Sequence, residues 1–167
     1  MSIRMKVILA SAALSLSTLG CSHQNPRVAT RLNQDASLAG DLPLNPLQGK
    51  VITSWIDKQS STMSTLYGND VAAQYARSNT QHDYSSGSVL SLVTWNQQED
   101  PRWFGGNIPA ALKSVEFVTV GTTTDHHTTY TYQKYEGAPL KKTSTQEGLT
   151  PNDRAIYLFS QRAAVMP

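Results

Sequence analysis

The feature that most constrains the fold is a series of short segments rich in β-branched and aromatic residues, separated by turn-forming residues. The strongest segment spans residues 88–96, in which Val89, Leu90, Leu92, Val93 and Trp95 form a nearly continuous apolar run. A strand that is apolar on both faces is typical of the middle of a sheet. We therefore predict a central strand over residues 88–96.

Weaker patterns of the same kind predict further strands. They lie at residues 51–56, 63–67, 114–120 and 128–135. Residues 71–77 have helical spacing, with Asn69 placed to cap the first turn, whereas residues 155–159 suit either a helix opened by Thr150-Pro151 or a strand. Residues 98–109 contain Asp-Pro, Gly-Gly and Ile-Pro, which predicts a long turn. Together these segments predict an α+β domain with a mostly antiparallel sheet of four or five strands and one or two helices.

The N-terminus has the parts of a secretory signal. Arg4 and Lys6 precede an uncharged apolar run, residues 7–19, which is followed by Gly20-Cys21. The run is shorter than the roughly 20 residues that a membrane-spanning helix needs. We therefore expect residues 1–20 to be removed as a signal peptide.

Cys21 lies where a lipoprotein signal peptidase would require a cysteine. The stretch Ser17-Thr18-Leu19-Gly20-Cys21 resembles a lipobox, and Cys21 is the only cysteine in the chain. An ordinary signal peptide that ends near a cysteine is the alternative. We predict lipid attachment at Cys21, a tether and lead-in over residues 21–46, and one domain over residues 47–162. The predicted location is the cell envelope, where the chain would face the periplasm and be anchored in the outer membrane.

The charge balance argues against nucleic acid as a partner. The chain has 14 Lys and Arg against 12 Asp and Glu, and the signal removes Arg4 and Lys6 without removing an acid. The remaining chain has no excess of basic residues and no basic run, so phosphate binding has no electrostatic basis.

Several blocks of sequence resemble the cytochrome P460 domain family over roughly residues 45–160. They are Leu66-Tyr67-Gly68-Asn69-Asp70, residues 84–95 (YSSGSVLSLVTW), residues 98–109 (QEDPRWFGGNIP) and residues 114–118. The resemblance implies a mostly antiparallel sheet and, in haem-bearing members, a covalently attached c-type haem that can oxidise hydroxylamine or bind nitric oxide. That attachment needs Cys-x-x-Cys-His, whereas residues 142–148 here read KTSTQEG. We therefore expect no covalent haem c and carry over no haem-ligand role.

Histidines offer a second kind of site. His126 and His127, with Asp125, could converge in a turn to hold zinc, copper or a non-covalent haem, and His82-Asp83 is a similar pair. A solvated turn is the simpler interpretation. Glu99, Asp100 and Glu116 could form an acid pair for glycoside hydrolysis, but their setting is typical of a solvated surface.

Aromatic residues suggest a ligand pocket. Trp103 and Phe104 lie in a turn that has no conformational need for them, so we predict that the loop 100–106 closes over one end of the sheet. The predicted ligand-binding residues, which would wall one shared pocket, are Tyr67, Arg102, Trp103, Phe104, Tyr130 and Tyr132.

These expectations define a leading hypothesis and a rival. The first is a lipid-anchored cytochrome P460-like protein without covalent haem that binds a small molecule or serves as an interaction module. The rival is a redox protein with a non-covalent haem or metal held by His126, His127 or His82. A purely structural envelope module is a third possibility.

Overall fold

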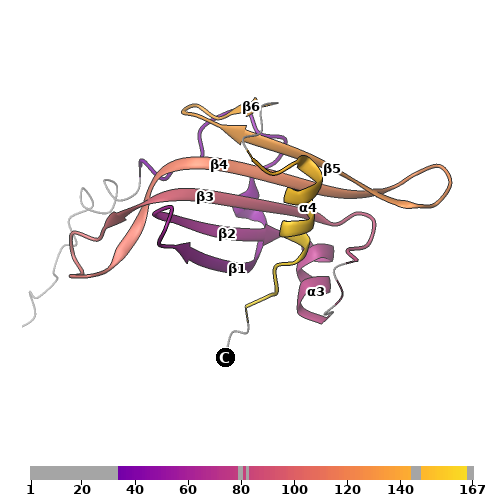
Figure 1. The fold of residues 1–167 in the computed structure, drawn as a ribbon, viewed down its shortest axis with the longest axis horizontal. Helices are drawn as coiled ribbons and strands as arrows, with labels where there is room; N and C mark the ends of the chain where they lie inside the picture. The colour runs from indigo at the N-terminus through magenta and orange to yellow at the C-terminus, as the bar shows by residue number, and fades with distance from the viewer. Residues whose placement is uncertain (1–33, 79–80, 82, 144–147, 165–167) are drawn as a thin grey trace, which may run out of the picture. The chain divides into compact units, whose positions relative to one another are not determined.

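The fold is built on a single antiparallel sheet (Figure 1). The computed structural model describes residues 34–78, 81, 83–143 and 148–164. Its six strands follow the chain order, β1-β2-β3-β4-β5-β6. Their bounds are Lys50–Asp57 (β1), Thr62–Gly68 (β2), Val89–Glu99 (β3), Asn107–Thr122 (β4), Thr128–Glu136 (β5) and Lys141–Thr143 (β6). The predicted α+β class is confirmed. With the short β6, the sheet has six strands, one more than the four or five that were expected.

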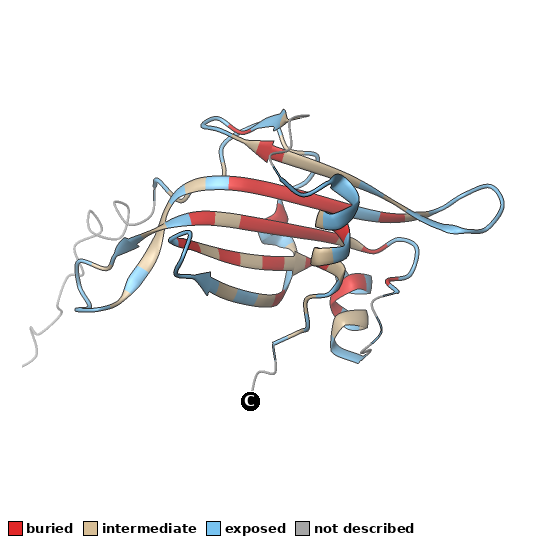
Figure 2. Cartoon of the chain, in the orientation of Figure 1, coloured by how far each residue is buried: buried red, intermediate tan, exposed pale blue. Residues whose placement is uncertain are grey.

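The prediction of a central strand at residues 88–96 is confirmed. Leu90, Leu92 and Val93 of β3 are at most 2% exposed, although Leu90 and Leu92 point to one face of the sheet and Val93 points to the other. Figure 2 shows burial concentrated in the middle of β3 and β4. The apolar run of β3 is therefore explained by cover on both faces.

Two helices connect with the sheet, α3 (Asp70–Ser78) and α4 (Pro151–Phe159), and a short 3-10 turn, η1 (Pro46–Gln48), precedes β1. As predicted, Asn69 caps α3, because its Oδ1 accepts a hydrogen bond from the Ala72 N–H at 3.0 Å. At α4, Thr150 and Asp153 form a capping box, which settles the ambiguous segment as a helix. No helix in the described part of the chain is long and apolar enough to cross a membrane.

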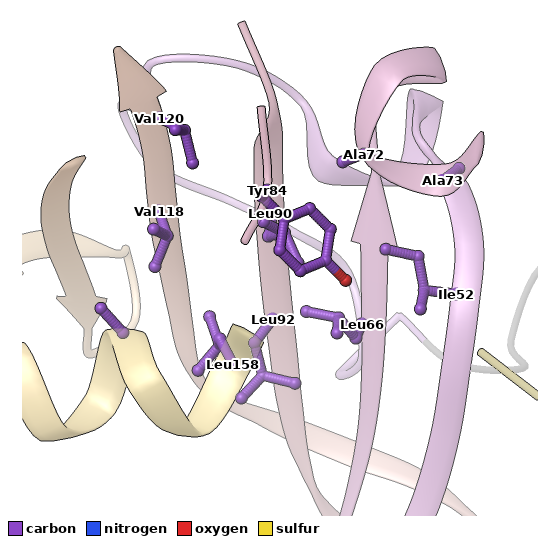
Figure 3. Close-up of a cluster of buried hydrophobic side chains, with 11 residues drawn as sticks. Ile52, Leu66, Ala72, Ala73, Tyr84, Leu90, Leu92, Val118, Val120 and Leu158 are labelled. Carbon is purple, nitrogen blue, oxygen red and sulfur yellow. The ribbon is translucent and has the colours of Figure 1, made fainter. Parts of the chain in front are cut away.

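Each face of the sheet has its own apolar cluster. Figure 3 shows the cluster on the helix-covered face, where Leu158 of α4 lies near Leu92 and where Ala72 and Ala73 of α3 approach Ile52. Gly68 allows this approach, because a Cβ there would lie 2.8 Å from Ile52 Cδ1 and 3.0 Å from Ala72 Cβ.

The second cluster lies on the opposite face. It contains Val93, Trp95, Val115, Phe117, Tyr135 and Leu140, with Tyr67 packed against it. No α-helix covers this face in the described residues. The lead-in does so instead, through Ala36, Leu38 and Leu42. The Trp95 indole N–H donates to the Ala36 carbonyl at 2.9 Å. Residues 34–46 are thus a packed part of the domain.

The turn predicted over residues 98–109 is present but shorter than expected. β3 and β4 pair as far as Glu99 and Asn107, which leaves only residues 100–106 as the turn. Pro109 sits within β4, opposite Gln97. Beyond Gln97 and before Ser114 these two strands pair only with each other, so they form a hairpin that projects past the rest of the sheet.

Candidate functional site

The helix-covered face changes from apolar to polar along the strands. Near α3, Leu90 of β3 lies opposite Val118 of β4, and both are fully buried. Toward the projecting hairpin, Ser64, Thr94 and Ser114 lie in one row across β2, β3 and β4. Because α4 buries its Ala155 and Leu158 over the apolar half, the polar half stays open beside the helix.

This open half is a groove of about 310 Å³, which we call the polar groove. Its walls come from five strands, from α4 and from the loops beside them. It is lined by Trp55, Asp57, Ser60, Thr62, Ser64, Leu92, Thr94, Lys113, Ser114, Glu116, Lys134, Glu136, Leu149, Arg154 and Tyr157. Its size is at the lower end of small-molecule sites, which are on the order of 300–1,000 Å³.

A buried ion pair forms the wall of the groove next to α4. Glu116 of β4 is 3% exposed. Its Oε1 accepts a hydrogen bond from Arg154 Nη2 at 2.7 Å, and its Oε2 accepts one from Arg154 Nε at 2.9 Å. The Tyr132 hydroxyl donates to Oε2 at 2.6 Å. The carboxylate is thus held by three donors, which compensates for its removal from water.

The partners of Glu116 are fixed in turn. Burial raises the pKa of the Tyr132 phenol well above its usual range, and the hydrogen bond to the Glu116 carboxylate raises this pKa further. Tyr132 therefore remains a protonated donor at neutral pH. The Arg154 guanidinium lies 4.8 Å from the centre of the Tyr157 ring, and that ring meets Trp55 edge to face at 6.3 Å.

The floor and the far wall of the groove present hydroxyls and opposite charges. The Ser64 and Thr94 hydroxyls are hydrogen-bonded to each other at 3.1 Å. Lys134 Nζ lies 2.6 Å from Glu136 Oε1, and Lys113 is exposed at the rim. Hydroxyls, carboxylates and ammonium groups around an aromatic pair can bind a small polar molecule of low net charge.

The predicted pocket around Trp103 and Phe104 is not formed. The Trp103 side chain is 75% exposed and Phe104 is fully exposed, both at the tip of the hairpin together with Arg102. The prediction that this loop closes over the sheet is therefore wrong, because the hairpin strands continue outward and carry the turn away from the other strands. Tyr67 packs on the opposite face from Tyr130 and Tyr132, so these tyrosines share no pocket.

Tyr130 and Tyr132 lie on the same, helix-covered face of the sheet but have different neighbours. Tyr132 touches Glu116 beside the polar groove. Tyr130 lies in a second hollow with Tyr84 and Phe159, where its hydroxyl donates to Asn152 Oδ1. That hollow has a volume of about 620 Å³ and lies between α4 and the ends of β4 and β5.

The histidines that the structure describes do not form a metal site. His126 and His127 are exposed in the turn between β4 and β5. His126 adopts a positive φ of 62°. Among the described residues, no three His, Cys, Asp or Glu side chains come together as metal ligands, so the converging cluster with Asp125 is not formed. His82 and Cys21 lie outside the described residues.

Sequence reasoning missed the central groups of the groove. The sequence around Glu116 is typical of a solvated acid, but this residue is buried. The available signal was a single acid within the otherwise apolar residues 115–118, because a charged residue in a buried strand requires a partner. Nothing local identifies Arg154 as that partner, since 38 positions separate the two residues.

Comparison with known proteins agrees with this architecture. A family model described as Cytochrome P460 matches residues 48–151, which span β1 to the start of α4. The match includes all the strands that form the floor of the polar groove. No curated protein matches the chain.

Proposed function

We propose that this chain, which belongs to the cytochrome P460 family, is a lipid-anchored cell-envelope protein whose polar groove binds a small polar molecule. The cluster of the buried Glu116 with the partly buried Arg154 and Tyr132 is the observation that carries the proposal. A buried ion pair contributes little net stability compared with apolar packing. Its place at the wall of an open groove favours a role in presenting a fixed pattern of charge to a ligand.

The chemistry of the groove favours a ligand bound without haem. A c-type haem needs two cysteine thiols and a histidine, and the lining of the groove contains no cysteine, histidine or methionine. Its tyrosine, Tyr157, is engaged with Arg154 and Trp55. These side chains do not fit a covalently attached haem.

A screen of small molecules tests the groove. We expect at least one compound from a panel of sugars, amino acids and dicarboxylates to raise the melting temperature of the chain that begins at Cys21. Thr94→Val should abolish this rise, because it removes a groove hydroxyl with little change of shape. Thr131→Val, on an exposed position of β5, is the matched control and should keep the rise.

A visible absorption spectrum and metal analysis of the same preparation test the rival function. A Soret band or a stoichiometric metal would favour a non-covalent haem or metal protein. A rise in melting temperature that survives Thr94→Val would place the ligand outside the groove.

The anchor has its own test. We predict that Cys21→Ser abolishes palmitate labelling and membrane association, because the thiol is the only possible site of thioether attachment in the chain. The measurement is fractionation of cells grown with labelled palmitate. A mutant that remains labelled in the membrane fraction would contradict lipid attachment at Cys21.

A further inference from the structure

Two large aromatic side chains project into solvent at the tip of the β3–β4 hairpin. Phe104 is fully exposed and Trp103 is 75% exposed, which makes them the most exposed large apolar residues in the described chain. Full burial of such a side chain is worth about 1.5–3 kcal/mol, so the hairpin forgoes a substantial stabilisation. The hairpin tip, defined as residues 100–106, therefore has the properties of a contact surface.

The hairpin tip holds these side chains in a fixed turn. The Asp100 N–H donates to the Gly106 carbonyl at 2.9 Å, and the Gly106 N–H donates to the Trp103 carbonyl at 2.9 Å. Asp100 Oδ1 accepts the Arg102 N–H at 2.9 Å. Gly105 supplies a positive φ of 77°. The exposed aromatic pair is thus presented by an ordered turn.

The path of the lead-in shows which way the hairpin tip faces. Ala36 lies against Trp95, near the base of the hairpin. The chain then crosses the sheet and reaches Gly49, which lies beside Gly68 at the opposite end of β2. Followed backwards, the lead-in leaves the sheet at the end that carries the hairpin (Figure 1).

The predicted lipid lies a short length of chain beyond that point. Twelve residues separate Cys21 from Gln34, and an extended chain spans at most about 3.3–3.6 Å per residue, or roughly 45 Å in total. A domain held to a bilayer by Cys21 is therefore tethered at its hairpin end. Tryptophan and phenylalanine are the side chains that partition into the interface between water and lipid.

We propose that the hairpin tip inserts Trp103 and Phe104 into the bilayer interface as a second membrane contact beside the lipid. The inference rests on the proposed anchoring at Cys21. The lipid holds the chain at the bilayer, and the second contact fixes which end of the domain faces the membrane. Because Asp100 balances the charge of Arg102 within the hairpin tip, the attraction is apolar, and added salt should not release it.

Fluorescence quenching tests this contact in the lipid-modified chain, reconstituted into phosphatidylcholine vesicles with or without bromine on the acyl chains. We expect tryptophan fluorescence to be lower in the brominated vesicles. Trp103→Ser should abolish the difference, because Trp95 is buried and Trp55 lies in the polar groove. Phe104→Ser should diminish it, and Val71→Ser, an exposed apolar site on α3, should leave it unchanged.

Flotation of the vesicles separates the two proposals. A chain that floats with the vesicles but shows no quenching of Trp103 overturns the insertion and leaves the lipid anchor intact. A chain that neither floats nor carries palmitate overturns the anchor and, with it, the inference. Quenching that disappears in 1 M salt would also contradict apolar insertion.

Discussion

Glu116 shows how one residue links the stability of this protein to its groove. Its carboxylate is buried at the sheet face, and its partner Arg154 comes from a helix that lies far along the chain. Attraction within such a pair roughly offsets the cost of removing both ions from water. The pair therefore matters most when one member is missing.

We predict that Arg154→Met lowers the free energy of unfolding by about 3 kcal/mol, the lower end of the range for a broken buried pair, because a quarter of the Arg154 side chain is exposed. Adding Glu116→Gln should restore much of the loss, since the uncompensated charge is removed. Urea denaturation of the two variants measures both effects. A double variant as unstable as the single one would show that Glu116 is not held by Arg154.

The buried phenol of Tyr84 makes the free energy of unfolding depend on pH in the alkaline range. Its ring is buried and stacks on Phe159 at 5.4 Å, and this burial raises the pKa of the phenol from 10.0 to about 12. Between these values the unfolded chain loses the proton while the folded chain keeps it. The contribution of Tyr84 is therefore full below pH 10 and is lost as the pH rises toward 12.

We expect the free energy of unfolding to fall between pH 9 and pH 11, and to fall less in Tyr84→Phe than in the wild type. Urea titrations at the two pH values measure this difference. Tyr157→Phe, the same exchange at a less buried tyrosine, is the control. An equal fall in Tyr84→Phe and the wild type would mean that Tyr84 does not titrate differently in the folded state.

At the scale of elements, β3 depends on cover from both faces. We predict that Leu92→Ala, on the helix-covered face, costs about 2–5 kcal/mol. Val93→Asp should prevent stable folding, because it places an unpaired charge against the lead-in face. Thermal and urea unfolding measure both changes. Val51→Ala, at a half-exposed site on β1, is the control and should change stability by no more than about 0.5 kcal/mol. Melting temperatures of both β3 variants close to that of the wild type would contradict a central role for β3.

The local sequence pattern was sufficient to predict those elements whose formation depends on neighbouring residues. The apolar run of β3 and the Asn69 cap of α3 follow from adjacent residues, and both were predicted. The alternative at residues 155–159 was settled by the capping box of Thr150 and Asp153 together with packing of Leu158 on the sheet. The hairpin extension was missed because pairing across Gln97 and Pro109 overrides the turn preference of the sequence.

At the scale of the whole molecule, the fold explains why the predicted pocket and the observed groove differ. A strand places alternate residues on opposite faces, so Tyr67 and Leu66 of β2 serve different clusters. Only the register across five strands and the position of α4 bring Ser64, Glu116 and Arg154 around one groove. Those relationships are long-range, and a single sequence does not reveal them.

The polar groove as a ligand site is the central claim, and it is tested most directly by NMR mapping of a small polar ligand on the chain from Cys21 onward. We predict that a compound which raises the melting temperature shifts the amide signals around Ser64, Thr94 and Ser114, together with the Arg154 guanidinium signals. Shifts confined to the opposite face around Tyr67, or to the hollow around Tyr84 and Tyr130, would contradict the claim.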